Sequence, residues 1–366
     1  MKITFRTDAS MHMGTGHVMR CLTLAEALTV RGAQCAFICR EHAGNLIQAI
    51  QSKGYEVHVL PAPPFESHGQ GDELAHSNWL GATQDDDALA CQAILQAKRP
   101  DWLVVDHYAI DARWEDALAP YYNKLMVIDD LADRLHRCDL LLDQTFGRDA
   151  ADYATLVPTH CRLLCGSQFA LLRPEFAALR TYSLQRRAAP QLRHLLITMG
   201  GVDKDNATGQ VLDALKTCAL PLDCQITVVM GHTAPWLSAI QKQAKSLPWP
   251  TQVLADVNNM AQLMADSDLA IGAAGATSWE RCCLGLPTLM IVLAENQRFA
   301  AAVLEIKGAV RLLDLDANFQ ANLKQEINTV VNFEASMSHL RDSSSVVCDG
   351  NGCAYVASWL MTKEEK

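Results

Sequence analysis

The chain has 366 residues, of which 49% are hydrophobic, so it is too long for one core of ordinary size and predicts about two domains. Its net charge is −10, and its 31 Lys and Arg residues form no dense tract beyond short pairs. This balance argues against binding to nucleic acid and favours a small-molecule partner. The sequence shows neither a signal peptide nor an apolar run of the roughly 20 residues that cross a bilayer, so we expect a cytoplasmic protein without a membrane partner.

The 13 cysteines are odd in number and scattered, which is a poor basis for a disulfide framework. Three close pairs lack the two-residue spacing that zinc sites favour: Cys35 and Cys39, Cys161 and Cys165, and Cys348 and Cys353. We therefore expect reduced cysteines that act as small hydrophobes, with no structural zinc.

Strand-like and helix-like segments alternate through the first half of the chain. A capping box at Thr83-Gln84-Asp85-Asp86 indicates the start of one helix, which runs to about residue 98. Another helix is expected at 17–31, and strands are expected at 2–6, 35–39, 55–60, 102–106, 125–128 and 140–142. Such alternation is typical of a parallel sheet covered by helices on both faces, so residues 1–178 are expected to form a doubly wound, Rossmann-like α/β domain.

A polar and basic stretch follows, and we expect residues 179–192 to form a hinge. The alternation then resumes, so residues 193–366 are expected to form a second doubly wound parallel-sheet domain. Its strands are expected at 195–198, 226–230, 269–271 and 289–292, and its helices around 206–217, 236–245, 258–265, 277–284 and 297–307. Turn residues at 343–345 and 349–352 precede a last helix at 354–361, and the sequence leaves open whether that helix crosses back to the first domain. Because ligands bind beyond the carboxyl ends of parallel strands, two such domains are expected to face each other across a cleft.

A bare loop, Gly14-Thr15-Gly16-His17, lies between the first predicted strand and the first predicted helix. Backbone N–H groups and the helix dipole favour an anion at such a place. The loop has neither the third glycine of a dinucleotide site nor the lysine of a P-loop. Taken alone, a tight turn explains it as well as a binding site does.

A second loop of small residues, 272–278, includes Gly275, Ala276 and Ser278 and leads into another predicted helix. Glu280 in the first turn of that helix either interacts with the helix dipole or accepts two hydrogen bonds from a ribose diol. Two such loops in two domains make a nucleoside diphosphate a more plausible ligand than either loop does alone.

Other polar groups have simpler explanations. The acidic groups at Asp85–Asp87 and Asp203–Asp205 are better explained as helix starts than as metal sites. Asp129 and Asp130 follow a strand at a place that suits a site residue, although the sequence assigns them no role. Histidines such as His58 and His194 are expected to be structural or exposed.

A series of motifs resembles the UDP-2,4-diacetamido-2,4,6-trideoxy-β-L-altropyranose hydrolases of pseudaminic acid biosynthesis, a source of sugar for flagellin glycosylation. The series opens with FRTDAS at 5–10 and GTGHVMRCL at 14–22. It continues with Val105–Tyr108, Asp129–Asp130, Cys165–Gly166, Leu172–Phe176, Thr198–Gly201, Gly275–Glu280 and Glu295–Gln297. The resemblance implies the two-domain GT-B fold that is also found in the MurG-type glycosyltransferases.

The resemblance further implies that water removes UDP from a UDP-linked 6-deoxy-diacetamido sugar, with inversion and C–O cleavage. His17 matches the general base of the family, Tyr108 a residue that helps to place the water, and Asn296 one that contacts the sugar. Glu280 matches the ribose-binding glutamate. The other matched substrate-binding positions are Gly14, Thr15, Gly16, Arg173, Gly200, Gly201, Gly275, Ala276, Ser278 and Gln297. Because UDP leaves as a stable anion, neither a metal nor another cofactor is needed.

Two other functions stay open at this point. A GT-B glycosyltransferase shares the donor chemistry, but the first domain shows no basic amphipathic helix of the kind that meets a lipid-linked acceptor. A non-catalytic nucleotide-sugar-binding protein would keep both loops and would not need a histidine base. Activity of a His17 variant separates the enzyme from the binding protein.

Overall fold

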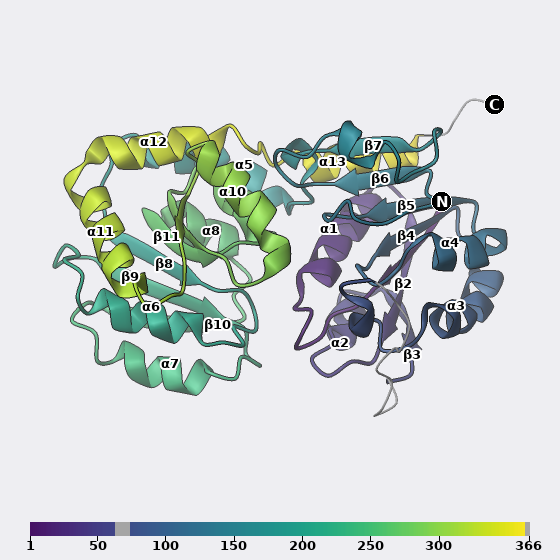
Figure 1. Cartoon of the computed structure of the whole chain (residues 1–366), viewed down its shortest axis with the longest axis horizontal. Coiled ribbons are helices and arrows are strands. Elements are labelled where there is room, and N and C mark those ends of the chain that lie inside the picture. The colour runs from purple at the N-terminus through teal and green to yellow at the C-terminus, as the bar shows by residue number, and fades with distance from the viewer. Residues whose placement is uncertain (63–73, 363–366) are drawn as a thin grey trace. The chain divides into compact units, whose positions relative to one another are not determined.

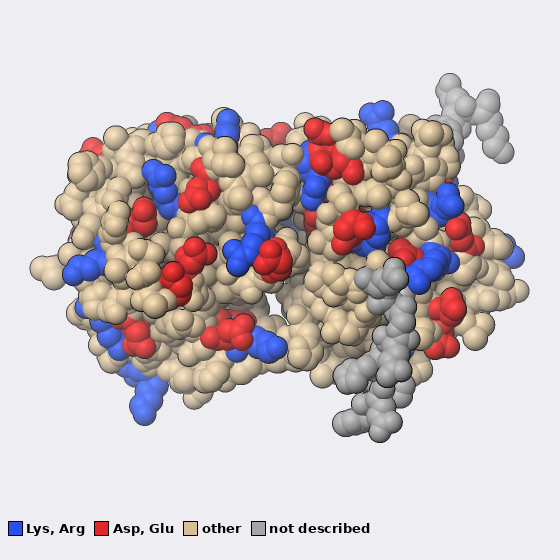
Figure 2. Space-filling model, viewed as in Figure 1, with Lys and Arg blue, Asp and Glu red and all other residues tan. Residues whose placement is uncertain are grey.

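The computed structural model describes residues 1–62 and 74–362, which form two compact α/β units (Figure 1). Unit 1 comprises Met1–Leu171 together with Asn351–Lys366, and unit 2 comprises Leu172–Gly350. On the face that Figure 2 shows, basic and acidic side chains are interspersed over both units. Within the described ranges, no helix has the length and apolar character needed to cross a membrane.

The described part of unit 1 contains a seven-stranded parallel sheet with the order β3-β2-β1-β4-β5-β6-β7. The strands are β1 (Lys2–Thr7), β2 (Gln34–Arg40), β3 (Glu56–Leu60), β4 (Trp102–Asp106), β5 (Lys124–Ile128), β6 (Leu140–Asp143) and β7 (Arg162–Cys165). β4 is buried along its whole length, as expected for a central strand covered on both faces. The strand order reverses between β1 and β4, and the crevice at such a reversal is where doubly wound sheets bind ligands.

Helices cover both faces of this sheet. They are α1 (Gly16–Val30), α2 (Ile47–Ser52), α3 (Gln84–Lys98), α4 (Ala112–Leu118) and α13 (Gly352–Met361), with short 3₁₀ turns η1 (Ser77–Trp79), η2 (Ala119–Tyr121), η3 (Ala150–Tyr153) and η4 (Ser167–Phe169). Val104 of β4 packs in one core with α1 and α13, whereas Val105 packs in another core with α3 and α4. The last helix therefore completes the core of the unit in which the chain begins.

Unit 2 contains a six-stranded parallel sheet with the order β10-β9-β8-β11-β12-β13. The strands are β8 (His194–Thr198), β9 (Gln225–Met230), β10 (Thr251–Ala255), β11 (Leu269–Ala273), β12 (Thr288–Ile291) and β13 (Arg311–Leu313). The helices are α5 (Pro174–Arg186), α6 (Ala207–Leu215), α7 (Leu237–Ala244), α8 (Met260–Asp266), α9 (Thr277–Cys283), α10 (Arg298–Ile306), α11 (Phe319–Asn332) and α12 (Glu334–Ser345), with η5 at Glu295–Gln297. Here the order reverses between β8 and β11.

Two expectations differ from the structure. The segment 179–192 begins inside α5, in unit 2, and the division between the units falls instead at residues 171–172 and 350–351. Arg187 of this segment is buried and not solvated, because it donates to the backbone oxygens of Met264 and Ser267. The serines at 343–345, expected in a turn, form the last residues of α12.

Candidate active site

The loop before α1 places a histidine at the carboxyl end of β1. Gly14 has a φ of +80°, which favours glycine, and its N–H donates to the Ser10 oxygen at 2.8 Å. Thr15 is the N-cap of α1 without a side-chain cap bond, and Gly16 is its first residue. His17 follows, with a side chain that is only 8% exposed.

Asp106, the last residue of β4, holds the ring of His17. The distance from His17 Nδ1 to Asp106 Oδ1 is 2.6 Å, and the carboxylate is fully buried. Because Nδ1 donates to the carboxylate, the second ring nitrogen, Nε2, is the one that is free to accept a proton. Within the described ranges Nε2 has no hydrogen-bond partner.

Arg20, one helical turn after His17, donates hydrogen bonds to the same carboxylate. Its Nε lies 2.6 Å from Asp106 Oδ2, and its Nη2 lies 2.7 Å from Asp106 Oδ1. Burial would raise the pKa of Asp106, but Arg20 and then His17 hold that pKa well below its usual range. Asp106 is therefore ionised, so it orients the imidazole and would stabilise its protonated form.

Tyr108 and Asp130 extend this network beside His17. The Tyr108 hydroxyl donates to Asp130 Oδ2 at 2.7 Å, and Arg20 Nη1 lies 2.5 Å from the same oxygen. The rings of Tyr108 and His17 meet edge to face, with centroids 4.6 Å apart. Because the Tyr108 hydroxyl donates its hydrogen to Asp130, the lone pairs of the Tyr108 oxygen are left to accept a hydrogen bond from a water molecule.

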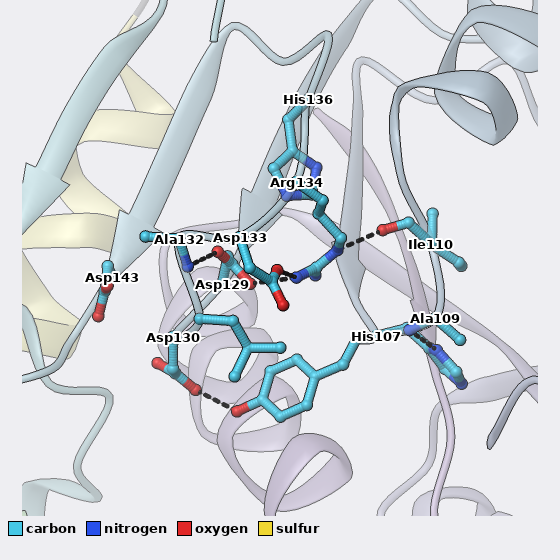
Figure 3. A network of polar contacts seen from close by, with 12 residues as sticks. His107, Ala109, Ile110, Asp129, Asp130, Ala132, Asp133, Arg134, His136 and Asp143 are labelled. Carbon is cyan, nitrogen blue, oxygen red and sulfur yellow. Dashed lines mark hydrogen bonds and ion pairs between the residues drawn. The ribbon is translucent and has the colours of Figure 1, made fainter. Parts of the chain in front are cut away.

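The carboxylate of Asp129, next to Asp130, is instead occupied by hydrogen bonds and an ion pair with other residues of the protein (Figure 3). It accepts from the Ala132 N–H at 2.9 Å and from the Tyr153 hydroxyl at 3.0 Å, and it pairs with Arg134 at 2.9 Å. The Tyr153 hydroxyl also lies 2.8 Å from Asp143. Burial and the nearby Asp130 raise the pKa of Asp143 to about 7, so this carboxyl titrates near neutral pH.

A second buried ionic cluster lies under the carboxyl ends of β1 and β2. Arg6 pairs with Asp8 at 2.7 Å and with Asp87 at 2.8 Å, and Arg40 reaches Asp87 at 2.7 Å. Asp87 also accepts from the Trp114 indole at 3.0 Å. The acidic start of α3 thus combines a capped first turn, in which Asp86 N–H donates to Thr83, with a structural ion cluster.

In unit 2, the loop after β11 is built around Ser278 and Arg281. The Gly275 N–H donates to Ser278 Oγ at 3.2 Å, and buried Arg281 donates to Ser278 Oγ at 3.2 Å and to the Ala273 oxygen at 2.8 Å. A Cβ at Gly272 would lie 2.7 Å from Arg281 Nη1, so a larger residue there would displace this guanidinium. Ala276 follows Gly275 as the residue before α9.

Glu280 lies on α9 with its side chain 17% exposed, and Arg173 Nη2 is 3.9 Å from its Oε1. Burial raises the pKa of Glu280 to about 7, although Arg173 and Arg281 lower it. Asn296 and Gln297 lie in η5, after the neighbouring strand β12, with Asn296 exposed and Gln297 Oε1 accepting from the Leu293 N–H at 3.0 Å.

The loop after β8 lies at the same edge of this sheet, because β8 pairs with β11 in parallel. Gly200 has a φ of +85°, and the Gly201 oxygen accepts from the Gly231 N–H at 3.1 Å. Asp203 accepts from the backbone N–H groups of Ala207 at 2.8 Å and Thr208 at 3.0 Å, in the first turn of α6, whose N-cap is Asn206. These bonds give Asp203 a structural role at the start of this helix.

The structure thus assembles two groups of residues, one at the strand-order reversal of each unit. His17 and Tyr108 lie together in unit 1, while Arg173, Glu280 and the residues of the three loops of unit 2 lie at the edge formed by β8, β11 and β12. Arg20 and Asp106 lie within the matched motifs, but the sequence assigns neither of them a role. One signal for Asp106 was available, since it is an acid that ends an otherwise apolar strand.

Within residues 1–62 and 74–362, no group of three or more His, Cys, Asp and Glu side chains is arranged to hold a metal ion. The 13 cysteines are all free thiols; Cys35, Cys161 and Cys165 are half-buried and the others are buried. This placement fits cysteines that pack as small hydrophobes.

Comparisons with known proteins agree with this architecture. Residues 194–345 match the glycosyltransferase family 28 C-terminal domain. The UDP-2,4-diacetamido-2,4,6-trideoxy-β-L-altropyranose hydrolase of Campylobacter jejuni subsp. jejuni is 28% identical over 310 residues, which are 84% of this chain and 97% of that protein.

Solved structures show the same fold. MurG of Acinetobacter baumannii superposes with a TM-score of 0.69 at 15% identity, covering 98% of this chain and 99% of MurG. The UDP-GlcNAc 2-epimerase of Neisseria meningitidis, bound to UDP-GlcNAc, gives 0.61 at 12% identity over 99% of this chain and 100% of the epimerase. The chain therefore has the GT-B fold, its unit 2 matches the glycosyltransferase family 28 C-terminal domain, and over most of its length it is similar to a UDP-sugar hydrolase.

Proposed function

We propose that the protein hydrolyses UDP-2,4-diacetamido-2,4,6-trideoxy-β-L-altropyranose to UDP and the free sugar. The observation that carries the proposal is the His17–Asp106 pair, in which a buried, ionised carboxylate holds Nδ1 and leaves Nε2 free to take a proton. The similarity to the Campylobacter jejuni hydrolase supplies the substrate. The protein then acts in the biosynthesis of pseudaminic acid, the sugar used in flagellin glycosylation.

In the proposed reaction, water attacks the anomeric carbon on the face opposite to UDP. One water proton goes to His17 Nε2. The other stays on the attacking oxygen as the hydrogen of the new anomeric hydroxyl, and during the attack it forms a hydrogen bond to the Tyr108 oxygen, whose own hydroxyl donates to Asp130. The new C–O bond forms as the bond to the β-phosphate oxygen breaks, and the bonding electrons leave with UDP. The sugar is released with inverted configuration at this carbon. Asp106 stabilises the imidazolium until the proton passes to solvent.

Unit 2 is proposed to bind the nucleotide. Glu280 would accept hydrogen bonds from the ribose diol, with Arg173 beside it, and the loops at Gly200–Gly201 and Gly275–Ser278 would hold the diphosphate. Gln297 would help to order the second loop, and Asn296, exposed in η5, would contact the sugar. In unit 1, Gly14, Thr15 and Gly16 would line the approach to His17, since a Cβ at either glycine would meet no atom within 4 Å.

A glycosyltransferase is the second candidate, because unit 2 matches the glycosyltransferase family 28 C-terminal domain and the chain superposes on MurG. The donor and the base would be the same in both reactions. Only the acceptor differs, since a sugar or lipid hydroxyl would replace water.

An NMR time course with this UDP-sugar in ¹⁸O-labelled water tests the proposal. We expect free sugar of inverted configuration that carries ¹⁸O at the anomeric carbon, and unlabelled UDP. We expect His17→Asn to lower kcat by about 10²–10⁴-fold while UDP binds as before. The matched control is His160→Asn, a change at a largely exposed histidine of the same unit.

Three results would contradict the proposal. Label in UDP would mean that the P–O bond is cleaved. Transfer to an added acceptor without release of free sugar would identify a transferase. Full activity of the His17→Asn variant would remove the proposed base.

A further inference from the structure

Three aromatic rings stand beside the proposed base, and we name this group, His76, Trp79 and Tyr108, the aromatic wall. The ring centroids of His76 and Trp79 are 4.4 Å apart, and those of Trp79 and Tyr108 are 5.8 Å apart at an interplanar angle of 26°. His76 and Tyr108 are 5.5 Å apart, which closes the group. His17 meets both Trp79, at 6.2 Å, and Tyr108, at 4.6 Å, with its edge.

The wall is anchored from two directions. Tyr108 follows β4, its hydroxyl is held by Asp130, and the Arg134 guanidinium lies 5.9 Å from its ring centroid. Trp79 is the last residue of η1, and the next residue, Leu80, is 1% exposed in the core formed with α3 and α4. Tyr108 is thus held by polar partners, and the segment that carries Trp79 is held by the buried residue that follows it.

Trp79 and His76 are nevertheless only half-buried, and the Trp79 ring meets the His17 ring edge to face. Burial lowers the pKa of His76, which keeps its ring neutral near neutral pH. Around these rings lie charged groups, including Asp133 and Arg134. An accessible aromatic surface with polar groups at its edge is the usual composition of a small-molecule site.

We propose that the aromatic wall is the sugar subsite of unit 1, and that Trp79 binds the apolar C–H face and the 6-methyl group of a 6-deoxy sugar. This inference rests on the proposed function and names the group that would hold the sugar while His17 activates water. A deoxygenated C6 presents a methyl group to the indole, whereas a C6 hydroxyl would lose its hydration there. The wall would thus favour a 6-deoxy sugar over its 6-hydroxy counterpart.

The test measures the affinity for the UDP-sugar and for UDP separately, in a His17→Asn background that keeps the substrate intact. Trp79→Leu retains apolar bulk but removes the ring face, and Trp79→Phe retains a ring. We expect Trp79→Leu to weaken binding of the UDP-sugar by about five- to tenfold, which corresponds to about 1–1.4 kcal/mol, and to leave UDP within twofold. Trp79→Phe should lose less than about threefold.

Leu89→Ala, at a 69% exposed position of α3, is the matched control and should bind both ligands as the parent does. A fluorescence readout works even where Trp79→Leu folds poorly. The UDP-sugar, but not UDP, should change the tryptophan emission of the parent, and Trp79→Phe should lose that change.

Two outcomes would overturn the inference without testing whether the protein hydrolyses the UDP-sugar. If Trp79→Leu bound the UDP-sugar as tightly as the parent does, the wall would not contact the sugar. If it lost UDP and UDP-sugar equally, the wall would bind the uracil ring instead. Failure of the proposed function is a separate result, seen as the absence of free sugar with the wild-type protein.

Discussion

The two candidate sites of this chain consist of different kinds of chemical groups, although each lies where the strand order of its sheet reverses. In unit 1 the site consists of buried charged side chains, with Asp106 at its centre between His17 and Arg20. In unit 2 it consists mostly of small residues and backbone groups, with Glu280 as the acid. The proposed proton transfer to His17 requires side chains that are held in place, whereas the proposed diphosphate could be held by several backbone donors. The comparison predicts that changes in unit 1 affect kcat and changes in unit 2 affect nucleotide binding.

The largest effect is expected at Asp106, which acts as a positioning residue for His17. Asp106→Asn should lower kcat by about 10²–10⁴-fold, because an amide does not fix the imidazole with Nδ1 as donor and does not stabilise its positive charge. The acidic limb of the pH–rate profile should move to lower pH, because the imidazolium has lost its anionic neighbour. Steady-state kinetics between pH 5 and 9 measure both effects.

A merely structural role of Asp106 would look different. It would lower the melting temperature and the amount of active protein without moving the pH profile. Asp116→Asn, at a surface position of α4 in the same unit, is the control and should leave both kcat and the profile unchanged.

The second-largest effect is expected at Glu280 in unit 2. Glu280→Gln should weaken UDP binding by about 10–100-fold, since hydrogen bonds to a charged acceptor contribute about 1.5–3 kcal/mol. The pKa of Glu280 is raised to about 7, so its carboxylate form grows as the pH rises through 7. We therefore expect uridine, which has no phosphate to titrate in this range, to bind more tightly at pH 8 than at pH 6. Calorimetry with uridine and UDP measures this.

The variant itself supplies one control, because Glu280→Gln should bind uridine equally at both pH values. Glu334→Gln, at the exposed start of α12, should behave like the wild type. A wild-type affinity for uridine that does not change between pH 6 and 8 would remove Glu280 from the ribose site.

A smaller effect concerns the stability of unit 1. The pKa of Asp143 is about 7 in the folded protein and near 4 in an unfolded chain, so the folded state binds this proton more tightly. Its stabilising contribution is present below about pH 4 and is lost as the pH rises to about 7. The free energy of unfolding of the wild type minus that of Asp143→Asn should therefore fall as the pH rises from 4 to 7. Urea unfolding at several pH values measures it, and a difference that does not change with pH would contradict it.

The smallest expected effect is none at all. Excess chelator should leave the hydrolysis rate unchanged if His17 and the two sites supply all of the chemistry. Inhibition by chelator that Mg²⁺ reverses would make a metal part of the reaction. The acidic groups near the sites would then be the candidate ligands of that metal. Turnover measured with and without chelator decides between these outcomes.

Much of the fold follows from sequence pattern, because strands such as Trp102–Asp106 are apolar runs bounded by turn residues. The strands that were not predicted are β7, β10 and β13, which lie at the edges of their sheets or have few residues. Thr251–Ala255 of β10, for example, follows Pro248-Trp249-Pro250 and is nowhere fully buried. Segment 179–192 was misinterpreted because buried arginines that bind backbone oxygens look like solvated ones in a sequence.

The candidate site, too, could be predicted only in part from the sequence. His17 and Tyr108 could be predicted from their motifs, but their partners lie far away in sequence. His17 and Asp106 are 89 positions apart, and Arg20 and Asp130 are 110 apart, so only the order of strands in the sheet brings them together. Trp79 carries no motif, and only its ring contacts to Tyr108 and His17 reveal its place.

The return of α13 to unit 1 has a consequence for biogenesis. Val356 and Leu360 complete the core around α1, and the Cys353 thiol reaches the Thr23 oxygen, yet all three are synthesised after the whole of unit 2. During synthesis on the ribosome, unit 1 therefore lacks its final helix until all of unit 2 has been made. Unit 2 at that point already has all of its own strands. A nascent chain arrested before residue 352 should consequently expose an unfinished apolar surface on its earliest-made part, which is where a chaperone would engage it.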